Sequence, residues 1–98
     1  MTRDEIISTI KNSADAIKAE GATAIYLFGS RLRGDNDQDS DVDLFIDYRK
    51  DQSFSLMELV GIQHIIEDAL DLDVDVTTRN SLHPLLKKNI EAEAMRIF

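Results

Sequence analysis

The spacing of apolar residues predicts one helix at the start of the chain and another in its middle. Thr2 and Glu5 have the spacing of a capping box, and the apolar positions that follow recur at helical intervals until Gly21. Ser55 and Glu58 repeat this spacing ahead of a second apolar stripe. The stripes are Ile6, Ile10, Ala14 and Ile17 in the first helix, and Leu56, Leu59, Val60, Ile66 and Leu70 in the second.

Three short segments have the pattern of β-strands. Residues 24–28 form an apolar run rich in strand formers, which ends abruptly at Gly29 and Ser30. In residues 42–47 apolar side chains alternate with carboxylates, and residues 72–77 repeat that alternation. Each of the last two strands therefore has one apolar face and one acidic face.

The end of the chain predicts a last helix, for which Pro84 suits the first position. Its apolar stripe, which continues almost to the end of the chain, is Leu82, Leu86, Ile90 and Ala94. The predicted order is α-β-β-α-β-α, in a single domain over residues 1–98. We expect an α/β (α+β) fold with a small mixed sheet, in which helices pack on one face and the acidic face stays open for a ligand.

The acidic strand faces predict a metal site. Asp41 and Asp43 are two residues apart on a predicted strand, so their carboxylates emerge on the same face and repel each other unless cations are bound. Asp75 or Asp73 on the neighbouring strand would complete a pocket for two divalent ions, the arrangement used for in-line phosphoryl chemistry. By itself, an Asp-x-Asp pair is more often the solvated face of a strand.

Composition narrows the choice of ligands and partners. The chain has no cysteine, which removes disulfides and thiolate zinc sites and leaves carboxylates as metal ligands. Carboxylates favour hard ions, so Mg²⁺ or Mn²⁺ is expected. A net charge of -8 repels phosphate backbones, which argues against long nucleic acid as a partner. A triphosphate that arrives neutralised by metal is compatible with this charge.

The sequence shows no sign of a membrane partner. No uncharged apolar run is long enough to span a bilayer, and the chain does not begin with an apolar signal stretch. We therefore expect a soluble, cytoplasmic protein.

The turn after the first strand predicts a phosphate-binding site. Glycine at position 29 lets backbone N–H groups approach a phosphate, and Ser30 adds a hydroxyl donor. Gly29 and Gly34 have the glycine spacing of a P-loop, but Asp35 and Asn36 stand where that motif requires Lys and Ser or Thr. The turn is therefore not a Walker motif, and it lies eleven residues before the acidic pair.

Three segments together carry a family resemblance: residues 29–34 (Gly-Ser-Arg-Leu-Arg-Gly), 40–44 (Ser-Asp-Val-Asp-Leu) and 74–76 (Val-Asp-Val). This combination resembles the minimal nucleotidyltransferase family of the DNA polymerase β superfamily, over nearly the whole chain. The resemblance implies a polymerase β-like fold and transfer of a nucleoside monophosphate, AMP from ATP, onto a hydroxyl with release of pyrophosphate.

The resemblance also implies roles for individual residues. Asp41, Asp43 and Asp75 would be the catalytic, metal-binding carboxylates, with two Mg²⁺ or Mn²⁺ ions as cofactors. Gly29, Ser30 and Arg33 would bind the triphosphate of the nucleotide. Arg33 is equally compatible with a solvated loop arginine. Phe45 shares the carboxylate face and is the aromatic candidate for contact with a nucleotide, although its place among apolar strand residues favours the core.

The same resemblance implies a protein partner. Bacterial members of the family are commonly encoded beside a HEPN-domain protein and act with it as antitoxin and toxin, and some transfer adenylate onto that partner. A homo- or hetero-oligomer is compatible with this role. The alternative is a non-catalytic binding module, which neutralises a partner toxin by masking it. Transfer to a small molecule such as an aminoglycoside ranks last, because larger relatives use an additional domain to hold that acceptor.

Overall fold

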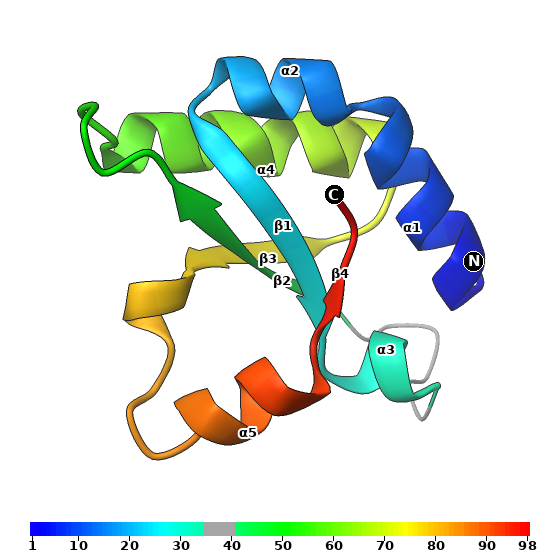
Figure 1. The fold of residues 1–98 in the computed structure, drawn as a ribbon. Helices are drawn as coiled ribbons and strands as arrows, with labels where there is room; N and C mark the ends of the chain where they lie inside the picture. The colour runs from blue at the N-terminus through cyan, green and yellow to red at the C-terminus, as the bar shows by residue number, and fades with distance from the viewer. Residues whose placement is uncertain (35–40) are drawn as a thin grey trace.

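A four-stranded sheet with helices on both sides makes up the computed structural model, which describes residues 1–34 and 41–98 (Figure 1). The elements along the chain are α1 (Arg3–Asn12), α2 (Ala14–Ala19), β1 (Ala22–Phe28), α3 (Ser30–Arg33), β2 (Val42–Tyr48), α4 (Leu56–Leu70), β3 (Val74–Thr78), the 3₁₀ helix η1 (Arg79–Ser81), α5 (Lys87–Glu93) and β4 (Met95–Arg96). The mixed α/β class predicted from the sequence is confirmed.

The sheet has the strand order β3-β2-β1-β4 and mixes the two kinds of pairing. β1 pairs antiparallel with β2 on one side and with β4 on the other. β2 and β3 are parallel, and α4 is the crossover helix that parallel neighbours require. The antiparallel and parallel pairings of β2 set Phe28 and Asp75 directly opposite Asp43.

The hydrophobic core lies between the sheet and helices α1, α2 and α4 (Figure 1). Its strand residues are Ile25, Leu27, Val42, Leu44, Ile46, Val74 and Val76, and its helix residues are Ile6, Ile10, Ile17, Ile62, Ile66 and Leu70. The strand residues alternate with the carboxylates, as the sequence pattern predicted, so the acidic side chains point away from the core. No helix within residues 1–34 and 41–98 is long and apolar enough to cross a membrane.

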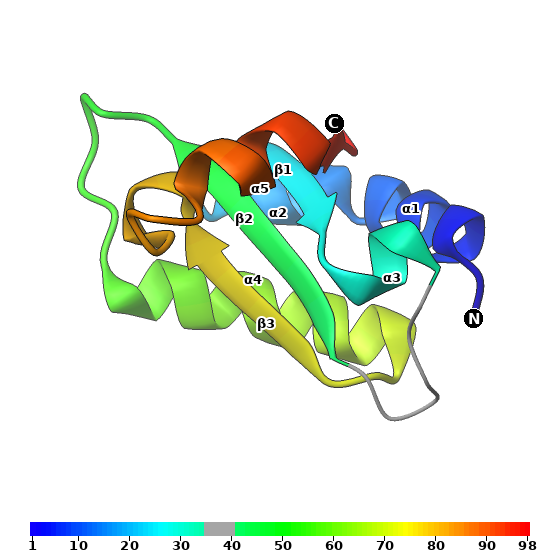
Figure 2. The same ribbon diagram turned by 90° about the horizontal axis from the view of Figure 1, so that it is seen from below.

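The placement of helices differs in part from the prediction. α1, α2 and α4 cover one face and α3 lies at the end of β1, whereas α5 is on the other side and crosses in front of β2 in the view from below (Figure 2). The first predicted helix is divided at Ser13, whose backbone (φ -98°, ψ 8°) ends α1 before α2 begins. The acidic face is therefore open over only part of its area.

The C-terminal residues form a strand where the sequence pattern predicted a continuing helix. α5 ends at Glu93, and Ala94 has extended geometry (φ -60°, ψ 145°). The N–H of Ile97 then donates to the carbonyl of Ile25 at 2.8 Å, and the Ile97 side chain is buried in the core. The helical prediction was wrong here because the free edge of β1 and burial of Ile97 together outweigh the local periodicity.

The capping boxes predicted at Thr2 and Ser55 are both confirmed. Ser55 accepts a hydrogen bond from the N–H of Met57 at 3.2 Å, and the Glu58 carboxylate accepts one from the N–H of Ser55 at 2.8 Å.

We expect Ser55→Ala to lower the free energy of unfolding by about 1 kcal/mol, or the melting temperature by roughly 5 °C, because the start of α4 loses its side-chain acceptor. Thermal denaturation measures this shift. Ser53→Ala, in the loop just before the helix, is the matched control and should leave the melting temperature within about 2 °C of the wild-type value. Equal shifts in the two variants would contradict a capping role.

Candidate active site

The acidic residues meet at the end of the sheet where β1 ends and β2 begins (Figure 2). Asp41 directly precedes β2, and Asp43 is its second residue. Asp43 is in register with Asp75 of the parallel strand β3, and residues in register on neighbouring strands point to the same face. Asp43 is half-buried, whereas Asp41 and Asp75 are exposed. The structure thus brings together the three carboxylates that were predicted to act jointly.

Asp73, the alternative for the third carboxylate, has a different position. It lies just before β3, and its backbone carbonyl accepts a hydrogen bond from the N–H of Val42 at 3.0 Å. The charges that act on Asp43 come from Asp75 and Asp41 rather than from Asp73. The geometry therefore favours Asp75 over Asp73 as the third carboxylate.

Gly29 packs directly against the carboxylate of Asp43. Its backbone has φ 78° and ψ -159°, a conformation that residues other than glycine rarely adopt. A Cβ added at this position would lie 2.5 Å from Oδ2 of Asp43, which is closer than any real contact of this kind. The carbonyl of Gly29 also accepts hydrogen bonds from the N–H groups of Leu32 and Arg33, at 3.1 and 3.2 Å. Glycine here thus starts α3 and leaves room for the acidic side chain.

The pKa of the Asp43 carboxyl is raised above its ordinary value. Burial is the largest cause, and the negative charges of Asp75 and Asp41 follow, while the positive charge of Arg33 opposes them. Within the described part of the chain, no three carboxylate or histidine side chains are arranged to hold a metal ion. Joint metal binding by Asp41, Asp43 and Asp75 therefore stays a prediction.

The raised pKa of Asp43 predicts how stability depends on pH. The pKa of Asp43 is higher in the folded than in the unfolded protein. The protonated carboxyl therefore contributes fully to the free energy of unfolding below the unfolded-state pKa, and this contribution is lost as pH rises through the folded-state pKa. We expect the free energy of unfolding of the wild type, relative to Asp43→Asn, to be lower at about pH 7 than at about pH 3.5 in metal-free buffer. Urea denaturation at both pH values measures it.

Taking the difference in free energy of unfolding between the two proteins cancels the pH dependence that other titrating groups contribute. The pKa values of Glu5 and Glu58 are lowered by their capping hydrogen bonds, and both residues are present in each protein. A difference that grew in favour of the wild type with rising pH would contradict the expected repulsion at Asp43.

Arg33 lies between the acidic end of the sheet and α5. Its Nη1 donates to Oε1 of Glu93 at 3.3 Å, and its charge acts on Asp43. The side chain is about half exposed, at 49%, so it lies at the surface of the site rather than beneath it. Glu93 could not be singled out from the sequence, since its contact with Arg33 depends on where α5 crosses the sheet. Arg31, the preceding arginine of the motif, is buried.

Phe45 is fully buried, which argues against the contact with a nucleotide considered above. Its ring stacks on Tyr26 with centroids 4.7 Å apart and lies 5.7 Å from the ring of Phe28. The guanidinium of Arg79 covers the two stacked rings, 4.9 Å from the Tyr26 centroid and 5.0 Å from that of Phe45. Sequence analysis missed Arg79, because nothing near it in sequence reveals these partners.

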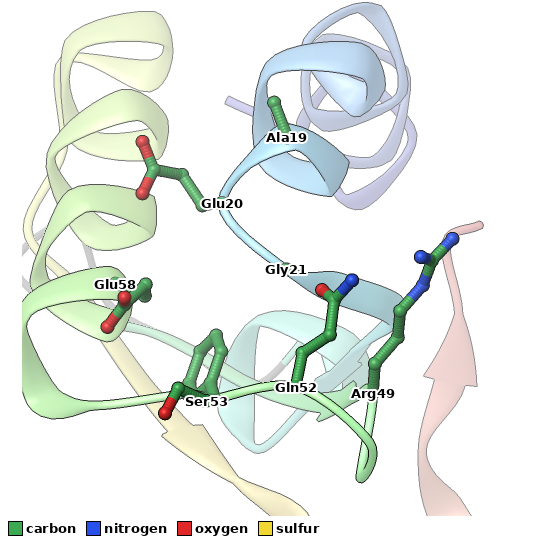
Figure 3. A pocket seen from close by; sticks show the side chains of 8 residues that line it. Ala19, Glu20, Gly21, Arg49, Gln52, Ser53 and Glu58 are labelled. Carbon is green, nitrogen blue, oxygen red and sulfur yellow. The ribbon is translucent and has the colours of Figure 1, made fainter.

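Two cavities of about 270 Å³ each lie away from the acidic end of the sheet. One is next to Gly21, at the opposite end of β1 from Gly29 (Figure 3). Figure 3 shows Glu20 and Glu58 on the side of α4 and Arg49 on the other side. The second cavity adjoins Asp47 and Arg79; its other lining residues are Ile46, Tyr48, Lys50 and Asn80. Neither includes a residue predicted to bind nucleotide or metal.

Part of the predicted motif is outside the described residues. Ser40, which begins the Ser-Asp-x-Asp segment, belongs to this part, as do Asp35 and Asn36, which were used to exclude a P-loop. Ser30 and Gly34, at the two ends of α3, are within the described residues. Phosphate binding by Gly29 and Ser30 stays a prediction.

Solved structures of similar fold include nucleotidyltransferases and toxin–antitoxin complexes. A proposed minimal nucleotidyltransferase superposes with a TM-score of 0.82 at 24% identity, over 97% of this chain and 95% of that one. A tri-AMPylated HEPN toxin of Shewanella oneidensis in complex with its MNT antitoxin gives 0.62 at 19% identity, over 90% and 68%. A toxin–antitoxin structure with AMP-PNP gives 0.69 at 21% identity, over 90% and 72%. At these identities the likeness concerns the fold, and it confirms the predicted architecture.

Sequence relatives extend the likeness to activity. A proposed protein adenylyltransferase of Methanocaldococcus jannaschii is 37% identical over 75 residues, which are 76% of this chain and 74% of the relative. The protein adenylyltransferase MntA of Thermococcus cleftensis is 29% identical over 98 residues, which are 99% and 97% of the two chains. A family model described as a nucleotidyltransferase domain matches residues 8–97. The resemblance found from the motifs is confirmed, and the chain belongs to the nucleotidyltransferase domain family.

Proposed function

We propose that this nucleotidyltransferase transfers AMP from ATP onto a hydroxyl of a HEPN-type toxin and thereby acts as an antitoxin in the cytoplasm. The observation that carries the proposal is the half-buried Asp43, which lies in register with Asp75 and against Gly29. A costly cluster of negative charge at the end of a sheet is expected where cations and a triphosphate bind. The sequence relatives are described as protein adenylyltransferases, which supports adenylate as the transferred group.

The donor groups of the site fit divalent metal ions. Asp41, Asp43 and Asp75 offer only oxygen ligands, which suit Mg²⁺ or Mn²⁺. The pKa of Asp43 is raised by burial and then by the charges of Asp75 and Asp41, and a bound cation would offset both effects. Two such ions, when bound, would neutralise the triphosphate and favour deprotonation of the attacking hydroxyl. The three side chains are not arranged to hold a metal ion as they stand. Asp41 or Asp75, both of which are exposed, would therefore change rotamer when an ion binds.

The proposed reaction forms one bond to the α-phosphorus of ATP and breaks another. The acceptor hydroxyl oxygen bonds to the α-phosphorus, and its proton passes to solvent. The bond from that phosphorus to the bridging oxygen breaks, and pyrophosphate leaves with the electron pair. Gly29 and Ser30 would hold the triphosphate by backbone and hydroxyl donors, while Arg33 would balance charge on the bound triphosphate.

A protein acceptor suits this chain better than a small molecule. The acidic end of the sheet is a surface feature, with Asp41 and Asp75 both exposed, so a partner could present a hydroxyl to it directly. A partner of that kind is supported by the structural neighbour described as a HEPN toxin in complex with MNT antitoxin, and by another described as a toxin–antitoxin with AMP-PNP.

Labelled ATP provides the direct test of this function. The purified chain is incubated with Mg²⁺, ATP labelled on the α-phosphate and the product of the adjacent reading frame. We expect label on that partner and release of unlabelled pyrophosphate. ATP labelled on the γ-phosphate is the control and should leave the partner unlabelled, because only AMP is transferred. Transfer of γ-label, or of none while a known adenylyltransferase works in the same assay, would contradict the proposal.

The alternative, a binding module that masks a toxin, makes a different prediction for the carboxylates. If masking suffices, the double variant Asp41→Asn with Asp43→Asn should neutralise the toxin as well as the wild type does. If transfer is required, the double variant should bind the toxin but fail to neutralise it. Growth assays with coexpressed toxin, together with affinity measurements on the purified pair, separate these outcomes.

A further inference from the structure

Arg79 lies on the open face of the sheet, where its guanidinium contacts both carboxylates and aromatic rings. Its Nε and Nη2 donate to the two carboxylate oxygens of Asp47, at 2.8 and 3.0 Å, and its Nη1 donates to Glu91 of α5. The guanidinium also lies over the stacked rings of Tyr26 and Phe45. A bidentate pair and an aromatic stack hold an arginine in one orientation, so little conformational freedom remains to be lost.

Helix α5 is tethered to the sheet at its C-terminal end, because β4, which follows Ala94, pairs with β1, but the helix itself packs only loosely. It spans only Lys87–Glu93, and none of its residues is buried. Leu85 and Leu86, which precede it, are exposed and do not anchor it in a core. A helix of two turns is unstable in isolation, so its position depends on tertiary contacts. Two ion pairs, made by Glu91 and Glu93, supply such contacts.

The two ion pairs tie α5 from different sides. Glu91 pairs with Arg79, and Glu93 pairs with Arg33 at 3.3 Å. Residues two apart on a helix point about 200° away from each other, so the helix lies between the two arginines. Arg33 is also the positive charge that acts on Asp43.

We propose that Arg79 is a positioning residue: through Glu91 it fixes α5 across the open face, and α5 holds Arg33 beside the acidic residues through Glu93. The effect on nucleotide rests on the function proposed above, whereas the mechanical link does not. An exposed ion pair contributes little by itself. Arg79 differs because Asp47 and two aromatic rings already fix its guanidinium before Glu91 binds.

Glu91→Gln tests the mechanical link, since it removes the pairing charge on α5 and leaves the Arg79–Asp47 pair in place. We expect the amides of α5 to exchange with deuterium about tenfold faster in this variant, while those of β1 and β2 keep their wild-type rates. Glu67→Gln on α4, on the other face of the sheet, makes the same change of charge and should leave α5 unaffected. Exchange in α5 at the wild-type rate in Glu91→Gln would overturn the proposal.

The Arg33 side chain gives a second readout that needs no nucleotide. Its Nε–H NMR signal should shift in Glu91→Gln in the same direction as in Glu93→Gln, and it should stay in place in Glu67→Gln. Faster exchange in α5 without a shift of the Arg33 signal would show that the helix does not hold this arginine, and would overturn the link.

Kinetics test the consequence for the nucleotide. We expect Glu91→Gln to raise the KM for ATP about fivefold with little change in kcat, as for the loss of one positioned ion pair. The double variant of Glu91→Gln and Glu93→Gln should have the same KM for ATP as Glu93→Gln alone, since both changes act through one link. Independent structural defects would instead raise the KM further in the double variant. An unchanged KM in an active enzyme would overturn the effect on nucleotide. Absence of transfer in the wild type would instead count against the proposed function, while exchange and NMR still decide the positioning role.

Discussion

Asp43→Asn is expected to reduce nucleotide transfer by on the order of a thousandfold while leaving the fold intact. The substitution keeps the shape of the side chain but removes the negative charge in register with Asp75. It also removes a charge that is disfavoured by burial and by the neighbouring charges of Asp75 and Asp41, which together raise the pKa of Asp43. The metal-free variant should therefore melt at the wild-type temperature or above it, by up to about 5 °C. Transfer assays and thermal denaturation on the same preparation measure both effects.

Stabilisation by bound ligand shows whether a variant has lost ligand binding or only the transfer reaction. With Mn²⁺ and triphosphate at about a hundredfold excess over the dissociation constant, the wild type should gain roughly 2.7 kcal/mol, and Asp43→Asn should lose most of that gain. Asp68→Asn, an exposed carboxylate on α4, is the control and should keep the full gain and the full activity. Full ligand stabilisation in Asp43→Asn would contradict the metal-binding role.

Gly29→Ala is expected to be the most destabilising single-methyl change at the site, by about 3 kcal/mol or roughly 15 °C in melting temperature. Two effects combine: the backbone has φ 78°, and the new Cβ would meet Oδ2 of Asp43 at 2.5 Å. Since Asp43 must move to relieve the contact, activity should fall about a hundredfold even in the folded fraction. Urea denaturation and transfer assays at low temperature measure the two losses.

Gly34→Ala is the matched control for that prediction. Gly34 has a nearly identical φ of 81°, but an added Cβ there would have nothing within 4 Å. We expect a loss of only about 1 kcal/mol, from the backbone conformation alone. The difference between the two variants then measures the contact with Asp43 together with the greater backbone strain at Gly29, whose ψ is -159° against 12° at Gly34. Equal losses would contradict both contributions.

Local signals were sufficient to predict most of the fold. Capping boxes at Thr2 and Ser55 gave the starts of two helices, and period-two alternation gave the strands around Val42 and Val74. The end of the chain could not be predicted in this way. Its helical periodicity is real up to Glu93, but the free edge of β1 is a feature of the assembled sheet and leaves no trace near Met95 in the sequence.

The residues of the candidate site also fall into those that local sequence patterns predict and those that depend on the assembled fold. Alternation alone puts Asp41 and Asp43 on one face, and a parallel neighbour with the same pattern suffices to bring Asp75 beside them. Arg79 and Glu93 could not be foreseen, because their partners come from distant elements whose relative placement only the structure gives. The burial of Phe45 agrees with its place among apolar strand residues, whereas its contact with Arg79 could not be predicted for the same reason.

The repulsion between the carboxylates of β2 and β3 also links the lifetime of this protein to the supply of its proposed substrate. Proteases act on the unfolded fraction, and a ligand that binds only the folded state lowers that fraction. At a hundredfold excess of metal-bound triphosphate over its dissociation constant, the unfolded population should fall by about a hundredfold. Where metal-bound triphosphate is scarce, nothing offsets the charges around Asp43, and we expect the chain to be degraded sooner. Turnover of a protein of this design would therefore depend on the supply of its nucleotide.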